Sequence, residues 1–160
     1  MQKMRNAECR LGQIALFLLG MLLAACGLFG SKTDAPPRME TRSILFKCDR
    51  DINHGMLLPV EVIYITTDDS LKEVMEIGPD AWFDSKQRES WAHRQTVSLR
   101  SGIDARLILN KPPQTKYIVI FASYFRNEDP EAQQIVLSPD AETEAPAEEV
   151  VWVGAASLYH

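Results

Sequence analysis

The stretch Tyr117-Ile-Val-Ile-Phe-Ala-Ser-Tyr-Phe125 decides the fold class of this 160-residue chain. Nearly every residue in it is apolar, so neither face of the segment suits contact with water. Such a run is typical of a central strand that is covered on both sides of its sheet. We therefore expect a sheet in which 117–125 is an inner strand, beginning after the break at Pro112-Pro113.

Other strands are predicted on both sides of this segment, from alternating apolar residues and from β-branched runs. They cover Ser43–Cys48, Val60–Thr66, Thr96–Arg100, Ala105–Leu109, Ile135–Leu137 and Val150–Tyr159, the last with Gly154 as a bulge. About seven short strands with turn signals between them predict a mainly β protein, built as a β-sandwich.

A small helical insertion is predicted near residues 70–92. Ser70 and Glu73 have the spacing of a capping box, and Gly78-Pro79 is expected to end the first helix. A second helical piece follows, with three aromatic contacts: Trp82, Phe83 and Trp91. These side chains either pin the insertion to the sandwich or form a partner surface, and we favour pinning.

The amino-terminal segment has the organisation of an export signal. Basic residues precede the apolar run Leu11–Leu23, which is short for a membrane span. The run closes with Leu-Ala-Ala-Cys26, a pattern that resembles the lipobox of bacterial lipoproteins, in which the cysteine is acylated. We predict a signal peptide over 1–25, lipidation of Cys26, a flexible tether over 26–42 and a folded domain over 43–160. The alternative is a buried cysteine in an ordinary apolar helix.

Charge and cysteine content narrow the class of protein further. The chain carries a net charge of −5, and removal of 1–25 would take away three basic and one acidic side chain, leaving about −7. An acidic surface argues against a nucleic-acid partner and against a polybasic grip on lipid, so the acyl chains would do the anchoring. Cys48 would be the one unmodified thiol, and its place in an alternating strand predicts a small core residue. An acidic, solvated loop is expected near 138–149.

The sequence contains no convincing catalytic or metal-binding motif, so we predict a protein that is not an enzyme and has no cofactor. A hydrolase could in principle assemble His93 with Ser90 and a carboxylate, but no motif indicates it. Asp49, Asp51 and Asn53 alternate like the start of a calcium loop, yet the glycine comes one place late and no glutamate closes the loop.

The connection between the first two predicted strands is unusual. Met56-Leu57-Leu58 places three large apolar residues in a surface loop, where exposure is costly without a partner. They either meet a partner or fold back over the core, and the sequence leaves both possibilities open.

The order of motifs resembles a known family. The lipobox is followed by Asp51-Ile-Asn53, Pro59-Val-Glu-Val-Ile-Tyr64, the aromatic insertion, Leu99-Arg-Ser-Gly102, and a Tyr-led strand that ends in Phe125-Arg126. This resembles the outer-membrane lipoprotein of the type VI secretion system, the SciN/TssJ family. The resemblance covers the chain from Cys26 onward.

The resemblance implies a transthyretin-like β-sandwich that faces the periplasm and is lipid-anchored in the outer membrane. It also implies that the loop between the first two strands holds the periplasmic region of an IcmF-like (TssM-type) inner-membrane protein. Carried over by position, the partner-binding residues would be Asp51, Ile52, Asn53, His54, Met56, Leu57 and Leu58. The alternative function is a periplasmic peptide- or ligand-binding lipoprotein, such as a pilotin or assembly chaperone, which a deep apolar pocket between the sheets would favour.

Overall fold

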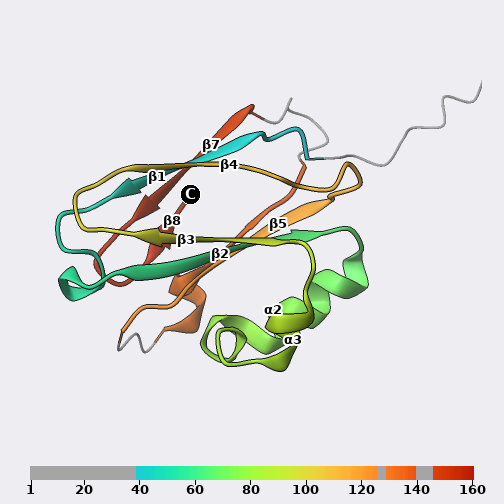
Figure 1. The fold of residues 1–160 in the computed structure, drawn as a ribbon, viewed down its shortest axis with the longest axis horizontal. Helices are drawn as coiled ribbons and strands as arrows, with labels where there is room; N and C mark the ends of the chain where they lie inside the picture. The colour runs from blue at the N-terminus through green and yellow to red at the C-terminus, as the bar shows by residue number, and fades with distance from the viewer. Residues whose placement is uncertain (1–38, 126–128, 140–145) are drawn as a thin grey trace, which may run out of the picture. The chain divides into compact units, whose positions relative to one another are not determined.

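Two four-stranded sheets form the protein in the computed structural model, which describes residues 39–125, 129–139 and 146–160 (Figure 1). Sheet A has the strand order β4-β1-β7-β8 and sheet B the order β3-β2-β5-β6. The strands of sheet A are β1 (Ser43–Cys48), β4 (Ala105–Ile108), β7 (Glu148–Val153) and β8 (Leu158–Tyr159). Those of sheet B are β2 (Leu58–Ile65), β3 (Arg94–Leu99), β5 (Tyr117–Ala122) and β6 (Gln134–Leu137). The predicted fold class, a mainly β sandwich with a helical insertion, is confirmed, with eight strands in the described residues rather than seven.

Strand β5 occupies the inner position that its sequence predicts. It pairs antiparallel with β2 on one side and with β6 on the other. Alternate residues of β5 then enter two different apolar clusters. Ile118 and Ile120 pack between the sheets, whereas Val119 and Phe121 pack beneath the helical insertion. All four are fully buried, and burying a side chain of this size contributes about 1.5–3 kcal/mol.

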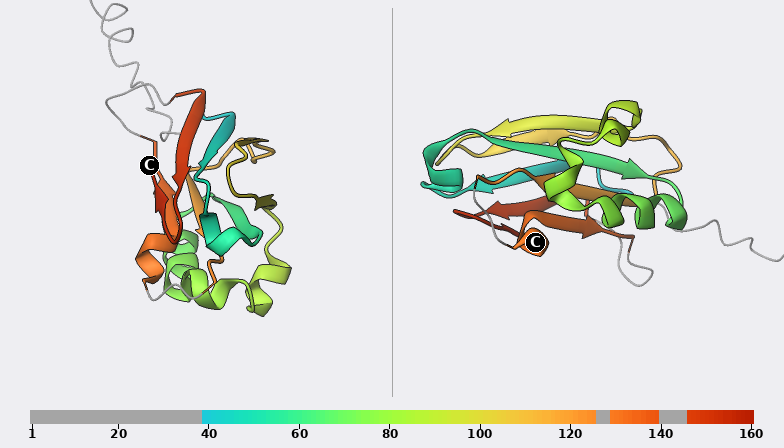
Figure 2. Two further views of the ribbon diagram at one scale, coloured as in Figure 1. Left: turned by 90° about the vertical axis from the view of Figure 1, so that its left-hand side faces the viewer. Right: turned by 90° about the horizontal axis from the view of Figure 1, so that it is seen from below.

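The helical insertion covers the outer face of sheet B (Figure 2). It consists of α2 (Asp68–Trp82) and α3 (Lys86–Ser90). The capping box predicted at Ser70 is wrong, because Thr67 is the N-cap and its hydroxyl oxygen accepts from the Ser70 N–H at 3.1 Å. The predicted stop at Gly78-Pro79 is confirmed, because Gly78 leaves helical geometry with φ 69° and ψ 168° and separates two helical segments within α2. Pro79 lies in the first turn of the second segment, where a proline is tolerated.

A buried carboxylate joins the insertion to the sheet. Glu61 of β2 is 0% exposed, and its Oε2 accepts from the Trp82 indole N–H at 2.7 Å. Its Oε1 accepts from Arg88 Nε at 2.8 Å and from the Thr96 hydroxyl at 3.1 Å, and lies 3.5 Å from Arg94 Nη1. Trp82 is fully buried with Phe121 and Trp91 around it. The aromatic residues of the insertion therefore pin it to the sandwich, as favoured from the sequence.

The folded domain begins earlier than the predicted boundary at Ser43. Met39 is 2% exposed and belongs to the core between the sheets, and its N–H donates to the Thr115 carbonyl at 3.2 Å. Thr41 is also buried. The prediction was wrong here because a single methionine among polar residues carries no periodicity that would distinguish a docked segment from a tether. The predicted signal peptide, Cys26 and most of the predicted tether lie outside the described residues.

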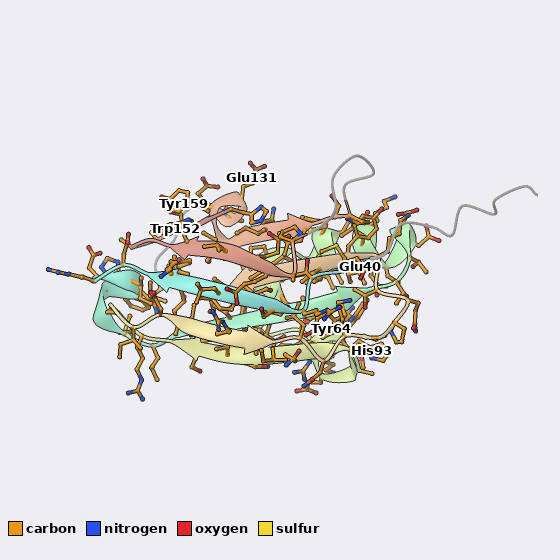
Figure 3. The ribbon with its side chains drawn as sticks, turned by 90° about the horizontal axis from the view of Figure 1, so that it is seen from above. Glu40, Tyr64, His93, Glu131, Trp152 and Tyr159 are labelled. Atoms are coloured by element: carbon orange, nitrogen blue, oxygen red, sulfur yellow. The ribbon has the colours of Figure 1, made fainter. Side chains whose placement is uncertain are left out.

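The carboxy-terminal segment differs from the single strand predicted over Val150–Tyr159. Glu148 and Glu149, expected in the acidic loop, begin β7, and the loop's central residues 140–145 lie outside the described residues. Gly154 is not a bulge; its N–H donates to the Ser157 carbonyl at 2.8 Å, closing a turn between β7 and β8. The two strands then pair antiparallel, which places Trp152 beside Tyr159 (Figure 3).

Cys48 has the environment of an unreactive thiol. It packs against the core, and burial raises its pKa to about 11, with smaller contributions from Asp104 and Asp49. Within the described ranges, no helix is both long enough and apolar enough to cross a membrane.

Candidate functional site

The structure divides the seven predicted partner-binding residues into two groups. Ile52 and Leu58 are 0% exposed and Asn53 is 3% exposed, so these three belong to the folded core. The remainder lie on the surface, with Met56 43% and Leu57 52% exposed and with exposed Asp51 and His54. The question left open by the sequence therefore has a mixed answer: Leu58 folds inward as the first residue of β2, and Met56 and Leu57 face solvent.

A left-handed turn gives the loop its shape. The segment η1 (Ile52–Gly55) has positive φ angles of 48° at Asn53, 55° at His54 and 78° at Gly55. Left-handed backbone costs roughly 1–2 kcal/mol for an ordinary residue, and asparagine and glycine tolerate it best. The turn must therefore be stabilised by contacts from elsewhere in the fold.

Asn53 supplies most of those contacts. Its side-chain Nδ2 donates to the Leu57 carbonyl at 2.8 Å, and its Oδ1 accepts from the Phe125 N–H at 2.6 Å. Its own N–H donates to the Ala155 carbonyl at 3.0 Å. One buried residue thus joins the loop to the end of the β5 segment and to the turn between β7 and β8. Asn53 therefore positions the loop and leaves almost none of its own surface exposed.

The turn between β3 and β4 lies against the same loop. Ser101 Oγ donates to the Ile52 carbonyl at 3.2 Å, and the Gly102 N–H donates to the Asp49 carbonyl at 2.7 Å. A pocket of about 360 Å³ opens between the two connections. It is lined by Gly55, Met56, Leu57, Arg100, Ser101 and Ile103.

The sequence prediction missed Arg100, Ser101 and Ile103. Ile103 is 59% exposed, so it repeats the signal that singled out Met56 and Leu57, a large apolar residue in a surface connection. That signal was available in the sequence, next to the turn at Ser101-Gly102. The juxtaposition of the two connections was not, because they join strands of different sheets.

The other chemistries considered from the sequence find no assembled site. Among the residues that the structure describes, no group of His, Cys, Asp and Glu side chains could hold a metal ion, and the Asn53 amide is committed to Leu57 and Phe125. Ser90 Oγ donates to the Gln87 carbonyl of its own helix. His93 is exposed, and its backbone carbonyl accepts a hydrogen bond from the Tyr64 N–H.

The pocket lies at the opposite end of β1 from the start of the folded domain. The chain enters β1 at Ser43, after Met39 has docked in the core, and leaves it at Cys48 toward η1. A strand of six residues spans roughly 17–20 Å. The pocket is thus separated from the point where β1 begins by the length of the strand.

Comparisons with known proteins identify the fold. No protein-family model and no curated protein sequence match the chain. Among solved structures, a chain of "Type VI membrane complex" matches with TM-score 0.61 at 14% identity, covering 76% of this chain and 98% of that chain. A chain of "T6SS protein TssM C-terminal domain" from EAEC matches with TM-score 0.56 at 13% identity, covering 74% and 94%.

A third solved structure that matches the chain is that of a lipoprotein. The type VI secretion lipoprotein TssJ1 of Pseudomonas aeruginosa matches with TM-score 0.55 at 18% identity, covering 78% of this chain and 95% of that chain. The match spans nearly the whole of that lipoprotein, so the two share an architecture and not just a local motif. In its fold, this chain is a TssJ-like β-sandwich protein.

Proposed function

We propose that this chain is a lipid-anchored structural subunit of a type VI secretion membrane complex. It is held in the outer membrane through Cys26, faces the periplasm, and binds the periplasmic region of an IcmF-like, TssM-type inner-membrane protein. The observation that carries the proposal is the fold shared with TssJ1 over 95% of that chain, preceded here by a lipobox that ends at Cys26.

The proposed mechanism is tethering, with no chemical step. Acyl chains on Cys26 supply about 0.8 kcal/mol for each buried methylene, and more than one chain makes release slow. Because Met39 is docked in the core, residues 27–38 remain as the tether, which spans at most roughly 40 Å when extended. The domain can therefore stand off the bilayer while its anchor stays in place.

The placement of the pocket supports the proposed binding of the partner by this loop. Met56 and Leu57 follow the end of β1 at Cys48, whereas the proposed tether would join the domain before its other end at Ser43. Apolar side chains that stand exposed beside a pocket are typical of binding surfaces. We assign the direct contact to the exposed residues of the loop and a positioning role to Ile52, Asn53 and Leu58.

The anchor is tested by replacing Cys26 with serine in the full chain. Incorporation of labelled palmitate and cleavage of the signal peptide should both be lost, and the protein should leave the outer-membrane fraction of a density gradient. A matched Cys48→Ser variant should keep labelling, processing and membrane location. Normal processing and membrane retention of Cys26→Ser would refute the anchor.

Binding of the partner through the loop is tested by co-purifying the inner-membrane partner from solubilised membranes. The double variant Met56→Asp, Leu57→Asp removes the exposed apolar surface without touching buried Leu58, whose deletion would disturb the core. Its control is Val150→Asp, Trp152→Asp, which changes two exposed apolar residues of sheet A. Loss of the partner in the first variant alone is expected. Equal recovery of the partner with both variants would exclude the loop as the interface.

A further inference from the structure

We infer that the pocket between the η1 loop and the β3–β4 turn binds an apolar side chain that lies next to a carboxylate on the partner protein. The inference deepens the proposed function and rests on it for the identity of the partner. It extends the binding surface to Arg100 and Ile103, which belong to a different connection from the loop. It also assigns the surface a chemical preference.

The apolar part of the preference follows from the walls of the pocket. Met56, Leu57 and Ile103 are 43%, 52% and 59% exposed and stand around one opening of about 360 Å³. That volume is near the lower end for small-molecule pockets, and it suits one or two bulky side chains. Filling it would remove three large apolar side chains from water together, which is the usual energetic centre of a protein interface.

The preference for a carboxylate on the ligand follows from Arg100. It is the one charged residue among the six that line the pocket. Arg88, Arg94 and Arg106 each contact a carboxylate, whereas Arg42, Arg50 and Arg100 contact none among the described residues, and of these three Arg100 alone lines the pocket. A guanidinium presents a planar set of donors that matches a carboxylate, so an unpaired arginine at an apolar opening favours an acidic neighbour on the ligand.

The pocket lining contains a single cation, so it offers one position for a carboxylate. In the adjoining loop the charge of Arg50 is offset by Asp49 and Asp51, and the chain as a whole has a net charge of −5. A run of several acids would find no further unbalanced positive charge here. One carboxylate beside one bulky apolar residue places its charge at Arg100 and leaves the rest of the segment neutral.

The pocket is already built in the unbound protein. The bond from Ser101 to the Ile52 carbonyl and the bond from Gly102 to the Asp49 carbonyl hold the two connections together. The Asn53 amide fixes the carbonyl of Leu57, the residue at the rim. A ligand therefore meets a surface whose backbone needs little ordering, which lowers the entropic cost of binding.

Methionine-methyl NMR on the membrane-extracted full chain tests the preference. The Met56 signal, assigned with Met56→Leu, reports on the pocket, and buried Met39 serves as the internal reference. The probes are capped hexapeptides that contain Leu-Asp, Leu-Asn or Ser-Asp in a Gly-Ser background. A fourth peptide ends in Leu with a free terminal carboxylate, which distinguishes a chain terminus from an acidic side chain as the source of the charge.

We expect the Leu-Asp peptide, the Leu-terminated peptide or both to shift Met56 without shifting Met39. The Leu-Asn and Ser-Asp peptides should bind about tenfold more weakly, as expected for the loss of one charged hydrogen bond or of the apolar anchor. Arg100→Gln should weaken Leu-Asp binding by the same factor. Its control is Arg42→Gln, an exposed arginine at the other end of β1.

Ile103 in the β3–β4 turn and Ile108 at the end of β4 give a second matched pair. Ile103 lines the pocket and Ile108 lies outside it, and they are 59% and 62% exposed. Ile103→Asp should abolish the Met56 response, and Ile108→Asp should leave the Kd unchanged. Equal affinity for Leu-Asp and Leu-Asn, or no Met56 response at about 10 mM of either carboxylate peptide, well above the millimolar Kd of a single-anchor contact, would overturn the inference.

The outcome is separable from that of the proposed function. A chain that responds to the Leu-Asp peptide but recovers no inner-membrane partner would refute the proposed partner and leave the pocket's preference standing. A chain that recovers the partner but shows no response to any peptide would refute the pocket's preference and leave the proposed partner standing.

Discussion

Asn53 has the largest structural role of any single residue in the loop. It adopts left-handed backbone with φ 48°, is 3% exposed, and its side chain satisfies the Leu57 carbonyl and the Phe125 N–H. Few other residues combine tolerance of positive φ with both a donor and an acceptor. An asparagine at this position is therefore important for the shape of the loop, even though the residue is almost fully buried.

Replacing Asn53 with alanine should lower the free energy of unfolding by about 2–4 kcal/mol. Two part-buried hydrogen bonds are lost, each worth about 0.5–1.5 kcal/mol, and alanine tolerates the left-handed backbone less well, which adds about 1 kcal/mol. Urea unfolding measures the change. Asn53→Gly loses the same hydrogen bonds but removes the backbone strain, so it should be less destabilising than Asn53→Ala. An alanine variant within about 0.5 kcal/mol of the original protein would contradict the role given to this side chain.

Cys48 should resist alkylation. Its pKa is raised to about 11, mainly by burial, and the reactive species is the thiolate. At pH 8 the native protein should therefore react with iodoacetamide about a hundredfold more slowly at Cys48 than the protein unfolded in guanidinium, with the modified peptide followed by mass spectrometry. The neutral thiol is favoured by the fold, so its stabilising contribution is complete below the unfolded pKa near 9.0 and is lost as pH rises toward 11. Equal native and unfolded rates at pH 8 would show that the thiol is exposed.

At the scale of elements, the helical insertion depends on one buried carboxylate. Glu61 lies at the middle of β2 and receives donors from α2, α3 and β3, through Trp82, Arg88 and Thr96. Burying a charge is unfavourable unless all of its partners are present, so the cost of removing one member exceeds the net value of the pair. The two helices and the sheet should consequently lose their packing together.

Glu61→Gln should destabilise the protein by about 3–5 kcal/mol, because two arginines lose their counter-charge and an amide donor faces other donors. The change can be measured by urea unfolding followed through tryptophan fluorescence, since Trp82 loses a partner for its indole N–H. Glu73→Gln on the exposed side of α2 provides the control and should be neutral. A small effect for Glu61→Gln would mean that apolar packing around Trp82 holds the insertion by itself.

At the scale of the whole molecule, the sequence predicts best where apolar pattern and burial coincide. Strand β5 was recognisable because both of its faces are covered, and Ile118 and Phe121 enter different clusters for that reason. Met39 was missed because its burial depends on a distant contact with Thr115. The break between β7 and β8 was missed because the turn at Gly154 is held by the Tyr124 hydroxyl, which donates to the Ser157 carbonyl at 2.8 Å.

The candidate site was predictable only in part. The exposed pair Met56 and Leu57 could be found from composition, since large apolar residues in a connection are conspicuous. The contribution of Arg100 could not, because it follows from the proximity of loops that lie far apart in the chain. Periodicity reports which face of an element is covered, and it carries no information about which connections meet at the end of a sandwich.

The position of β1 has a mechanical consequence. Tension between an anchor before Met39 and a partner held at the pocket would act along this strand, which is hydrogen-bonded to β4 on one side and to β7 on the other. A pull parallel to the strand loads both rows of bonds in shear, so they must break together. An edge strand pulled sideways would instead peel away one bond at a time. Under the proposed function, load on this inner strand would therefore be shared by both rows of bonds at once.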